Sequence, residues 1–288
     1  MQLLIGFEFE FGWLPETNKK HAPYFMGETV FREVRKNLKD FFQDDFSFVK
    51  TIEDDVSISF PKTEPKDYYG VEVVTKPMLE DVAIQFCKKM LYWMKNNSRV
   101  STNKTCSLHV NMSIKEKTIN QKLDYFSILQ LTPQNEILTQ YGRTNNSYCK
   151  STKEMKFNLT VGSYATKSRN FEYWLNKVKI GKTTMNTVKP NLYGFNVPKS
   201  QIQKKTIEFK DKIIWAELIK ERYLSSLEHE EKAIAIVEKM SPENIRYFEF
   251  RMIGNTNYHL RWTEIKKNIN SFKQALKKSI KPIDPLML

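Results

Sequence analysis

Hydrophobic and polar residues alternate along residues 2–11, near the start of the chain. Successive side chains of an extended backbone leave opposite sides, so every second residue shares a face. One face of this segment is wholly apolar and consists of Leu3, Ile5, Phe7, Phe9 and Phe11. The opposite face ends with the carboxylates of Glu8 and Glu10. The alternation predicts a β-strand that buries its apolar side and presents two carboxylates on the other.

The same patterning predicts further strands and helices. Strands are expected at residues 46–60, 69–75, 106–114 and 245–253, with a short one at 157–161. Helical spacing of apolar residues occurs at 28–42, 77–95, 118–141, 168–178, 211–224, 226–239 and 259–279, with a break near Pro133. Strands with polar faces, separated by helices, predict an α+β fold in which helices cover one face of a sheet.

The middle of the chain is less regular. Residues 142–165 are rich in Asn, Ser and Thr, and residues 181–209 are polar with scattered strand signals. We expect a boundary between two parts of the chain near 142–150, although nothing there resembles a true linker.

Composition narrows the class of protein. The 288 residues are 40% hydrophobic and 13% aromatic, which argues for a sizeable core and against global disorder. Three cysteines match no zinc or disulfide spacing, so a reducing cytoplasm is the simpler location. The first residues lack the form of a signal peptide, and no apolar run approaches the roughly 20 residues of a membrane helix. We therefore expect a cytoplasmic protein.

The formal net charge is +13, from 46 basic and 33 acidic residues. A basic balance is typical of proteins with anionic partners, such as nucleic acid, nucleotides or acidic substrates. Lysine is spread along the whole chain, however, and no basic run exceeds a few residues. A solvated lysine-rich surface is the simpler interpretation.

Glu8 and Glu10 are the first candidates for chemistry. Their side chains leave one face of the strand about 7 Å apart, where they repel unless a cation or water lies between them. For a Glu-x-Glu pair alone, an exposed strand with solvated carboxylates is the commoner case. The flanking phenylalanines indicate a central strand, which favours a functional role.

Other acidic positions have competing interpretations. Asp55, in Asp54-Asp55-Val56-Ser57, is typical of a turn closed by an Asx hydrogen bond. Glu72 lies within a valine-rich strand and points either to solvent or into the floor of a polar site.

The last two predicted strands add a histidine and an ion pair. His109 shares a polar face with serines and Asn111, and a metal ligand and a structural histidine remain equally open. Glu249 and Arg251 are spaced as in a common salt bridge. In a functional site, the carboxylate would hold a metal and the guanidinium a phosphate. Taken together, these oxygen-rich strands suit Mg²⁺ or Mn²⁺.

The order of these motifs resembles the amidoligase family, ATP-dependent carboxylate–amine ligases of bacteria and phages with a glutamine synthetase-like catalytic fold. The matching segments are Gly6-Phe7-Glu8-Phe9-Glu10-Phe11, Asp55-Val56-Ser57, Val71-Glu72-Val73-Val74-Thr75-Lys76-Pro77, Cys106-Ser107-Leu108-His109-Val110-Asn111 and Phe248-Glu249-Phe250-Arg251-Met252. A weaker match runs from Arg143 to Cys149. The matches extend from residue 6 to about 270 and are poor over 160–240.

The resemblance implies roles for individual residues. The implied ligands of Mg²⁺ or Mn²⁺ are Glu8, Glu10, Glu72, His109 and Glu249. Arg251 would hold the transferring phosphate, Asp55 and Ser57 would border the nucleotide or the amine, and Arg143 would contact the ATP cofactor. Arg251 and Asp55 are the expected catalytic residues. The family often has His-Val-His where this chain has His109-Val110-Asn111, and Asn111 is a poorer metal ligand.

The resemblance also implies an architecture and a reaction. Residues 1–288 would form one amidoligase-like domain with a curved, antiparallel-rich sheet, helices on its outer face, and a helical or irregular insertion near 150–240. ATP would convert a carboxylate, from a small molecule or a peptide, into an acyl phosphate that an amine attacks. Metals and arginine offset the repulsion between the anions. The chain has no Gly-rich Walker loop, so metals and side chains must bind the phosphates.

Two other classes of function stay open. The first is a nucleic-acid-binding or virion assembly component that keeps the fold without turnover. It is motivated by the charge, by the Lys-rich stretch 199–212, and by the aromatic residues Trp13, Tyr68, Tyr69 and Tyr173. The second is a metal-dependent nuclease, since clustered carboxylates beside a basic surface also fit that chemistry.

Overall fold

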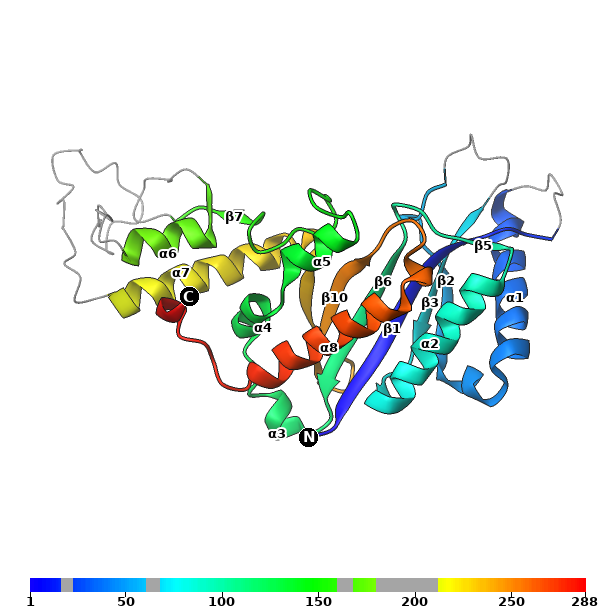
Figure 1. Ribbon diagram of the computed structural model, residues 1–288, viewed down its shortest axis with the longest axis horizontal. Coiled ribbons are helices and arrows are strands. Elements are labelled where there is room, and N and C mark those ends of the chain that lie inside the picture. Colours follow the sequence, from blue (N-terminus) through cyan, green and yellow to red (C-terminus); the bar gives the residue numbers. More distant parts are fainter. Residues whose placement is uncertain (17–22, 61–67, 160–167, 180–211) are drawn as a thin grey trace. The chain divides into compact units, whose positions relative to one another are not determined.

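The computed structural model describes residues 1–16, 23–60, 68–159, 168–179 and 212–288. The chain divides into two compact units, and Figure 1 labels most of their helices and longer strands. The first combines Met1–Thr144 with Ala235–Lys281, and the second combines Asn145–Ile234 with Pro282–Leu288. All of the predicted site residues belong to the first unit.

The first unit is built on an eight-stranded sheet in the order β2-β3-β1-β6-β10-β9, with the short strands β4 and β5 also paired to β1. Its strands are β1 (Leu3–Trp13), β2 (Val49–Asp54), β3 (Tyr69–Thr75), β4 (Met78–Leu79), β5 (Val100–Ser101), β6 (Ser107–Ile114), β9 (Ile236–Met240) and β10 (Arg246–Gly254). All of these strand pairs are antiparallel. The predicted α+β class is confirmed, and β1 is a central strand.

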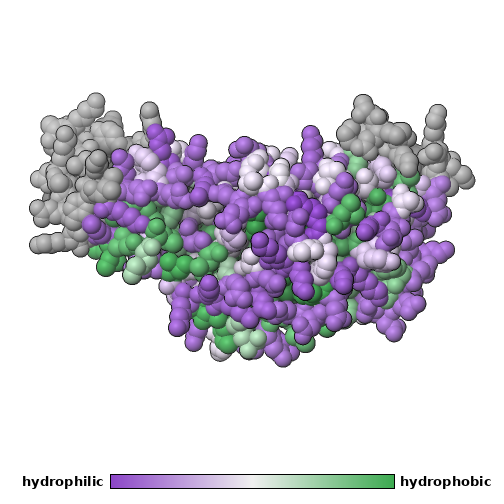
Figure 2. All heavy atoms as spheres, in the orientation of Figure 1, coloured by the Kyte–Doolittle hydropathy of each residue, from purple (hydrophilic) through white to green (hydrophobic). Residues whose placement is uncertain are grey.

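Helices cover the apolar face of this sheet. The helical elements of the unit are α1 (Pro23–Phe42), η1 (Gln43–Phe48), α2 (Glu80–Asn96), α3 (Lys117–Asn120), α4 (Tyr125–Leu131), α5 (Gln134–Gln140), η5 (Tyr258–Leu260) and α8 (Trp262–Lys278). Ring centroids of Phe11 in β1 and Trp93 in α2 are 5.7 Å apart. Phe250 in β10 stacks on Phe272 in α8 at 4.3 Å. In the view of Figure 2, polar side chains cover most of the outward side of α2 and α8.

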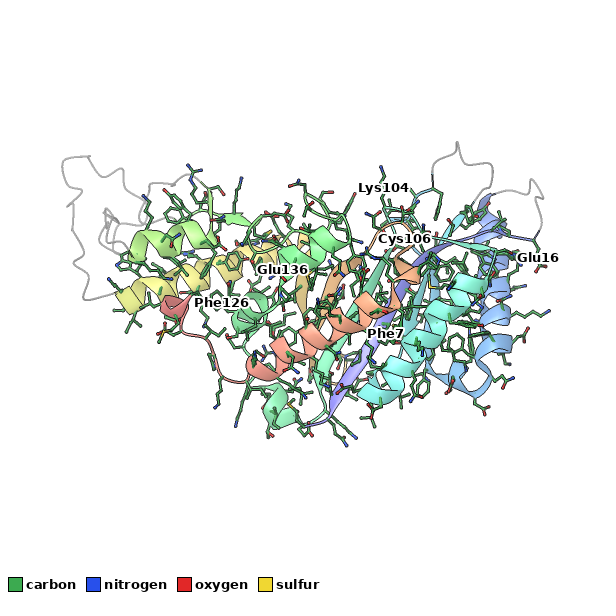
Figure 3. All side chains as sticks on the ribbon, viewed as in Figure 1. Phe7, Glu16, Lys104, Cys106, Phe126 and Glu136 are labelled. Atoms are coloured by element: carbon green, nitrogen blue, oxygen red, sulfur yellow. The ribbon has the colours of Figure 1, made fainter. Side chains whose placement is uncertain are left out.

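The alternation in β1 determines which side of the sheet is buried. Its five apolar residues from Leu3 to Phe11 are each at most 3% exposed, and Figure 3 shows Phe7 where β1 passes α8. Burying each large side chain contributes roughly 1.5–3 kcal/mol. A register slip of one residue would turn Glu8 and Glu10 into this core. Burial of the phenylalanines therefore holds both carboxylates on the opposite face, which we call the polar face.

The second unit has its own small core. Its elements are β7 (Lys156–Phe157), β8 (Arg169–Asn170), α6 (Phe171–Lys179), α7 (Lys212–His229), η4 (Glu231–Ala233) and η6 (Pro285–Met287). Tyr223 of α7 lies 5.5 Å from Phe157 and 5.2 Å from Phe171, measured between ring centroids. These aromatic contacts join the two helices to strand β7.

Several predicted elements are confirmed to within one residue, namely the strands at 69–75, 106–114 and 245–253. The helix break near Pro133 is also confirmed, because α4 ends at Leu131 and α5 begins at Gln134. The strand predicted at 46–60 is shorter, with η1 before it and a loop at 55–60 after it. All of 181–209, and all of the Lys-rich stretch 199–212 except Lys212, lie outside the described residues.

The helix predicted at 226–239 is wrong. Helix α7 ends at His229, and Ile236–Met240 form strand β9 beside β10. Residues 234–237 are a short run of buried apolar side chains, which suits a strand and a buried helix equally well by periodicity. Pairing with β10 decides for the strand.

Two further observations bear on the expected class of protein. None of the described helices is long and apolar enough to cross a membrane. Trp13, named above among the aromatic residues that motivate nucleic-acid binding, is fully buried and lies under the guanidinium of Arg99. Trp13 is therefore a core residue, which removes it from the argument for nucleic-acid binding.

Candidate functional site

The predicted metal ligands meet on the polar face because of the strand order. Three cross-strand pairs hold them in register: Glu10 with Glu72, Glu8 with His109, and Glu249 with Asn111. Directly opposed residues of antiparallel strands share a face with their side chains close together. Strands β3, β1, β6 and β10 therefore bring distant parts of the sequence into one polar row.

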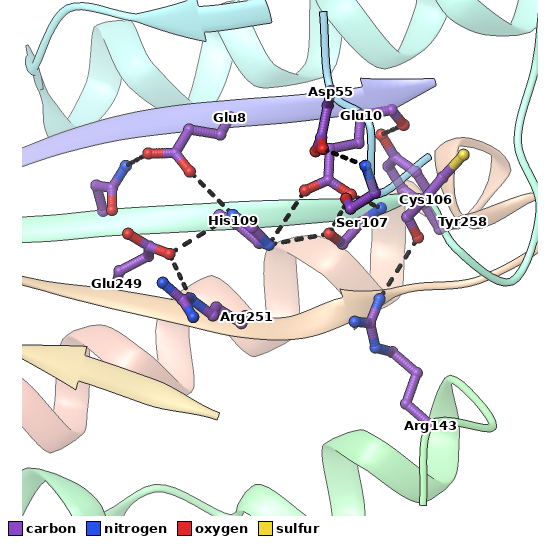
Figure 4. A network of polar contacts seen from close by, with 12 residues as sticks. Glu8, Glu10, Asp55, Cys106, Ser107, His109, Arg143, Glu249, Arg251 and Tyr258 are labelled. Atoms are coloured by element: carbon purple, nitrogen blue, oxygen red, sulfur yellow. Dashed lines mark hydrogen bonds and ion pairs between the residues drawn. The ribbon is translucent and has the colours of Figure 1, made fainter. Parts of the chain in front are cut away.

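His109 occupies the centre of this row (Figure 4). Its Nδ1 lies 2.9 Å from Oε2 of Glu8 and 3.6 Å from Oε1 of Glu249. Its Nε2 lies 3.4 Å from Oε1 of Glu10. Burial lowers the pKa of His109, but the surrounding carboxylates, Glu10 foremost, outweigh burial and raise the pKa to about 9. The imidazole is thus a cation that holds three carboxylates together.

Glu8 is held in its ionised form. Burial raises its pKa, but the hydrogen bond and charge of His109, with the amide of Asn111, lower it to about 2. The Asn111 amide donates to Oε1 of Glu8 at 2.8 Å. Oδ1 of Asn111 is buried and has no hydrogen-bond partner among the described residues. Asn111 therefore orients the Glu8 carboxylate and keeps an unused oxygen on the same face.

Glu10 is anchored by residues that sequence reasoning did not single out. Its Oε2 accepts hydrogen bonds from the backbone N–H of Ser107 at 2.8 Å and from the Ser107 hydroxyl at 2.5 Å. The Tyr258 hydroxyl donates a hydrogen bond to the backbone carbonyl of Glu10 at 2.9 Å. The motif around His109 contains Ser107, but only the register of β1 and β6 shows which carboxylate it binds.

Two glycines allow the loop at 55–60 to lie on the polar face. A Cβ added at Gly12 would stand 2.3 Å from the Phe60 ring, and one at Gly70 would stand 2.8 Å from the Asp55 carbonyl oxygen. The close approach brings the Asp55 carboxylate to Glu10 and Glu72, with ligand atoms within 4.8 Å of one another. The absence of side chains at these two positions is what lets Asp55 reach the site.

The turn at Asp55 also has the Asx hydrogen bond that its sequence predicted. The backbone N–H of Ser57 donates to Oδ1 of Asp55 at 2.8 Å. The Ser57 side chain is exposed at the outer side of this loop. Asp55 therefore combines a turn-forming role with a position in the polar row, whereas Ser57 lies at its margin.

Glu72 is a carboxyl group with a strongly raised pKa. Burial, followed by the negative charges of Glu8 and Glu10, raises the pKa of Glu72 to about 8. A carboxyl group that is difficult to ionise beside two others is favourable for binding a cation, because the cation would remove the repulsion.

Glu249 lies on the basic side of the row. Its side chain is 1% exposed, and its Oε1 accepts a hydrogen bond from Nε of Arg251 at 2.5 Å. Lys239 of β9 forms an ion pair with its other oxygen. Lys239 was missed because its segment was predicted to be helical. A usable signal was the short apolar run before it, bounded by Ser241-Pro242, which is typical of a strand.

Arg143 lies at the far end of the polar face, beside Ser107 and Gly254. It is 6% exposed, and its Nη1 donates to the Cys106 carbonyl at 3.4 Å (Figure 4). The structure thus gathers every predicted site residue except Ser57 along the polar face of one sheet.

The donor set fits a divalent cation. Two groups of three ligands share Glu72, and they are Glu8-Glu72-His109 and Glu10-Asp55-Glu72. Carboxylate oxygens with one imidazole are ligands that Mg²⁺ and Mn²⁺ accept. The unpartnered Oδ1 of Asn111 adds a neutral oxygen beside the first group. Glu249 belongs to neither group, because Arg251 and Lys239 hold its carboxylate.

A comparison with known families agrees with this geometry. The model of the family described as "Putative amidoligase enzyme" matches residues 2–210, and the chain belongs to this family. No curated protein matches the chain. The matched range includes the carboxylates of β1 and β3, the Asp55 loop and His109. Glu249 and Arg251 lie beyond it, and the sheet brings them to the same face.

Proposed function

We propose that this protein is an ATP-dependent ligase that joins a carboxylate to an amine through an acyl phosphate. The observation that carries the proposal is the polar row itself. Five carboxyl groups and His109 lie on one sheet face with the cationic side chains of Arg251 and Lys239, in a chain of the amidoligase family. Transfer of a phosphoryl group between anions requires such neighbouring positive charge.

The two ligand groups would hold divalent cations. Glu8, Glu72 and His109 suit one position, and Asp55 joins Glu10 and Glu72 at a second. Bound Mg²⁺ or Mn²⁺ would supply neutralisation of the ATP phosphates. The proposal also takes the sheet to be of the curved, glutamine synthetase-like type, with residues near 150–240 as an insertion in a single amidoligase-like domain.

The chain's own residues have separate roles in the proposed reaction. A substrate carboxylate oxygen attacks the γ-phosphorus of ATP while the bond to ADP breaks, and Arg251 binds the transferring phosphoryl group. The amine nitrogen then attacks the acyl carbon, phosphate leaves, and the amine loses a proton for which Asp55 is the nearby acceptor. Ser57 borders the nucleotide, and Arg143 lies within the same face as a contact for an anionic ligand.

The test is ADP release by purified protein supplied with Mg²⁺, ATP and pools of amines and carboxylates. Glu8→Gln and Glu249→Gln should each lower turnover at least a hundredfold while the far-ultraviolet circular dichroism spectrum stays unchanged. Glu33→Gln is a matched control, because Glu33 has the same 18% side-chain exposure as Glu8 but pairs with Arg99, away from the polar face.

Wild-type turnover in both Gln variants would contradict the ligase proposal. Binding of DNA with a steep salt dependence, without nucleotide binding at millimolar Mg²⁺, would favour a nucleic-acid-binding component instead. Cleavage of DNA without ATP would favour a nuclease.

A further inference from the structure

The second group of candidate ligands combines two strands and a loop. Glu10 belongs to β1 and Glu72 to β3, and strand pairing places them directly opposite each other. Asp55, the third member, follows the last residue of β2 and lies in the Asp55 loop, residues 55–60. The sheet register therefore does not position Asp55, and contacts made by the loop must hold its carboxylate beside the other two.

The side chains of Asn103 and Thr105 bind the backbone of this loop at Ser59. The Ser59 N–H donates to Oγ1 of Thr105 at 3.1 Å, and the Asn103 amide donates to the Ser59 carbonyl at 2.8 Å. Oδ1 of Asn103 accepts hydrogen bonds from the Thr105 hydroxyl at 2.7 Å and the Thr105 N–H at 2.8 Å, which orients both side chains. Both backbone groups of Ser59 are thus bonded to side chains, as they would be to a neighbouring strand.

The segment that carries Asn103 and Thr105, which we call the support segment (residues 103–107), also anchors Glu10. Ser107, at its end, binds the Glu10 carboxylate through its N–H and its hydroxyl. The Cys106 N–H donates to the Asn103 carbonyl at 3.1 Å, which closes a turn within the segment. One short segment therefore holds both the Glu10 carboxylate and the loop that carries Asp55.

The other contacts of the Asp55 loop leave this connection to the support segment. The hydrogen bond between Asp55 and the Ser57 N–H sets the shape of the turn. Ile58 is 7% exposed, and a Cβ at Gly70 would stand 2.8 Å from its Cβ, so Ile58 lies directly against β3. The bonds at Ser59 relate the loop to the segment before β6, and β1 lies between β3 and β6. The loop is thus held on both sides of the strand that carries Glu10.

We infer that Asn103 and Thr105 are positioning residues of the second cation position, because their bonds to the loop hold the Asp55 carboxylate beside Glu10. The inference rests on the proposed function, which takes Glu10, Asp55 and Glu72 as ligands. Removing a group that orients a metal ligand without touching the ion commonly weakens binding by about ten- to a hundredfold. Loss of the Thr105 hydroxyl should therefore weaken the second cation and leave the first nearly unchanged.

Thr105→Val and Thr105→Ser are a matched pair, because valine nearly keeps the shape of threonine and serine keeps its hydroxyl. Titration with Mn²⁺, followed by the electron paramagnetic resonance of free Mn²⁺, should show two bound ions in the wild type. The second ion should bind at least tenfold more weakly to Thr105→Val and to Asn103→Ala, and Thr105→Ser should retain it. Asn37→Ala is the control, because Asn37 of α1 accepts hydrogen bonds from Trp93 and Asn97, away from the polar face.

Hydrogen exchange in the metal-free protein tests the hold on the loop separately from metal binding. Mass spectrometry should show the amides of 55–60 exchanging about tenfold faster in Thr105→Val than in the wild type, and at the wild-type rate in Thr105→Ser. Unchanged exchange in Thr105→Val, or faster exchange with both Mn²⁺ ions bound as tightly as in the wild type, would overturn the inference. Faster exchange in Thr105→Val, with no Mn²⁺ bound even by the wild type, would support the hold on the loop while contradicting the proposed function.

Discussion

At the scale of single residues, the protonated imidazole of His109 holds the carboxylates of the site together. His109 and Glu72 are side chains whose raised pKa values, about 9 and about 8, leave both protonated at neutral pH in the metal-free protein. The proton on His109 holds Glu8, Glu10 and Glu249 together. A divalent cation bound by the same groups would take over that function and displace the protons.

Cation binding should therefore release protons and strengthen with rising pH. Both groups must lose a proton to act as ligands, so Mn²⁺ affinity should rise between pH 7 and 9, by up to about tenfold per pH unit for each proton released. Calorimetry in buffers of different ionisation enthalpy counts the protons. Glu72→Gln should release fewer, and pH-independent Mn²⁺ affinity would contradict this account.

The metal-free protein should show the opposite dependence on pH. The raised folded-state pKa of His109 stabilises the fold fully below its ordinary value of 6.5, and this contribution is lost as pH rises through about 9. Glu72 retains its proton in the fold up to about pH 8, so it also makes stability fall with rising pH above 4.5. Excess Mn²⁺ should remove part of this decline in urea unfolding experiments.

Lys239 should contribute to the stability of the fold, because its ion-pair partner Glu249 is buried. Lys239→Met should cost roughly 1–3 kcal/mol of unfolding free energy, since Glu249 is 1% exposed and loses one of its cations. Urea unfolding measures the loss. Lys89→Met is the control, because Lys89 and Asp45 are 37% and 49% exposed. Exposed ion pairs of this kind contribute less than about 1 kcal/mol to the free energy of unfolding. Equal losses in the two variants would argue against a buried ion pair at Glu249.

At the scale of elements, the polar face follows from the alternation of residues within strands. The side of the sheet taken by Glu8, Glu10, Glu72, His109 and Glu249 could be predicted, because large apolar neighbours commit the other side to the core. Lys239 could not be predicted, because a short apolar run leaves helix and strand undecided until β10 is present. The Asp55 loop can pack against the sheet because Gly12 and Gly70 have no side chains. These two glycines lie side by side only because β1 pairs with β3, which the sequence does not reveal.

Substitution of Gly70 tests whether the close packing of the Asp55 loop is needed for metal binding. Gly70→Ala would place a methyl group 2.8 Å from the Asp55 carbonyl oxygen, so the loop must move away and withdraw Asp55 from Glu10 and Glu72. We expect Mn²⁺ affinity to fall at least tenfold, as measured by calorimetry. Gly27→Ala in α1 is the control, since its Cβ would meet only ordinary contacts and helical alanine is favourable by about 0.5–1 kcal/mol. Unchanged affinity in Gly70→Ala would show that Asp55 is not a ligand.

At the scale of the whole molecule, the unit that carries the site and the second unit each have their own core. The polar row draws only on the first unit, from β3, β1, β6, β10 and β9 and from the loop at 55–60. The family match extends from residue 2 to residue 210 and so covers part of both units. The order of motifs in the sequence indicated the amidoligase family, which the family match confirms. Only the folded sheet shows that Glu249, Arg251 and Lys239 lie together on the polar face.

We propose above all that this polar face binds divalent cations for the chemistry of ATP. Anomalous diffraction from crystals grown with Mn²⁺ and a non-hydrolysable ATP analogue tests it most directly. We expect Mn²⁺ about 2.1 Å from an oxygen of Glu72, with further ligands from Glu8 and His109 or from Glu10 and Asp55. Phosphate oxygens should lie within reach of Arg251. Nucleotide bound elsewhere, or a polar face that binds no Mn²⁺ at saturating concentration, would contradict a metal–nucleotide site on this face.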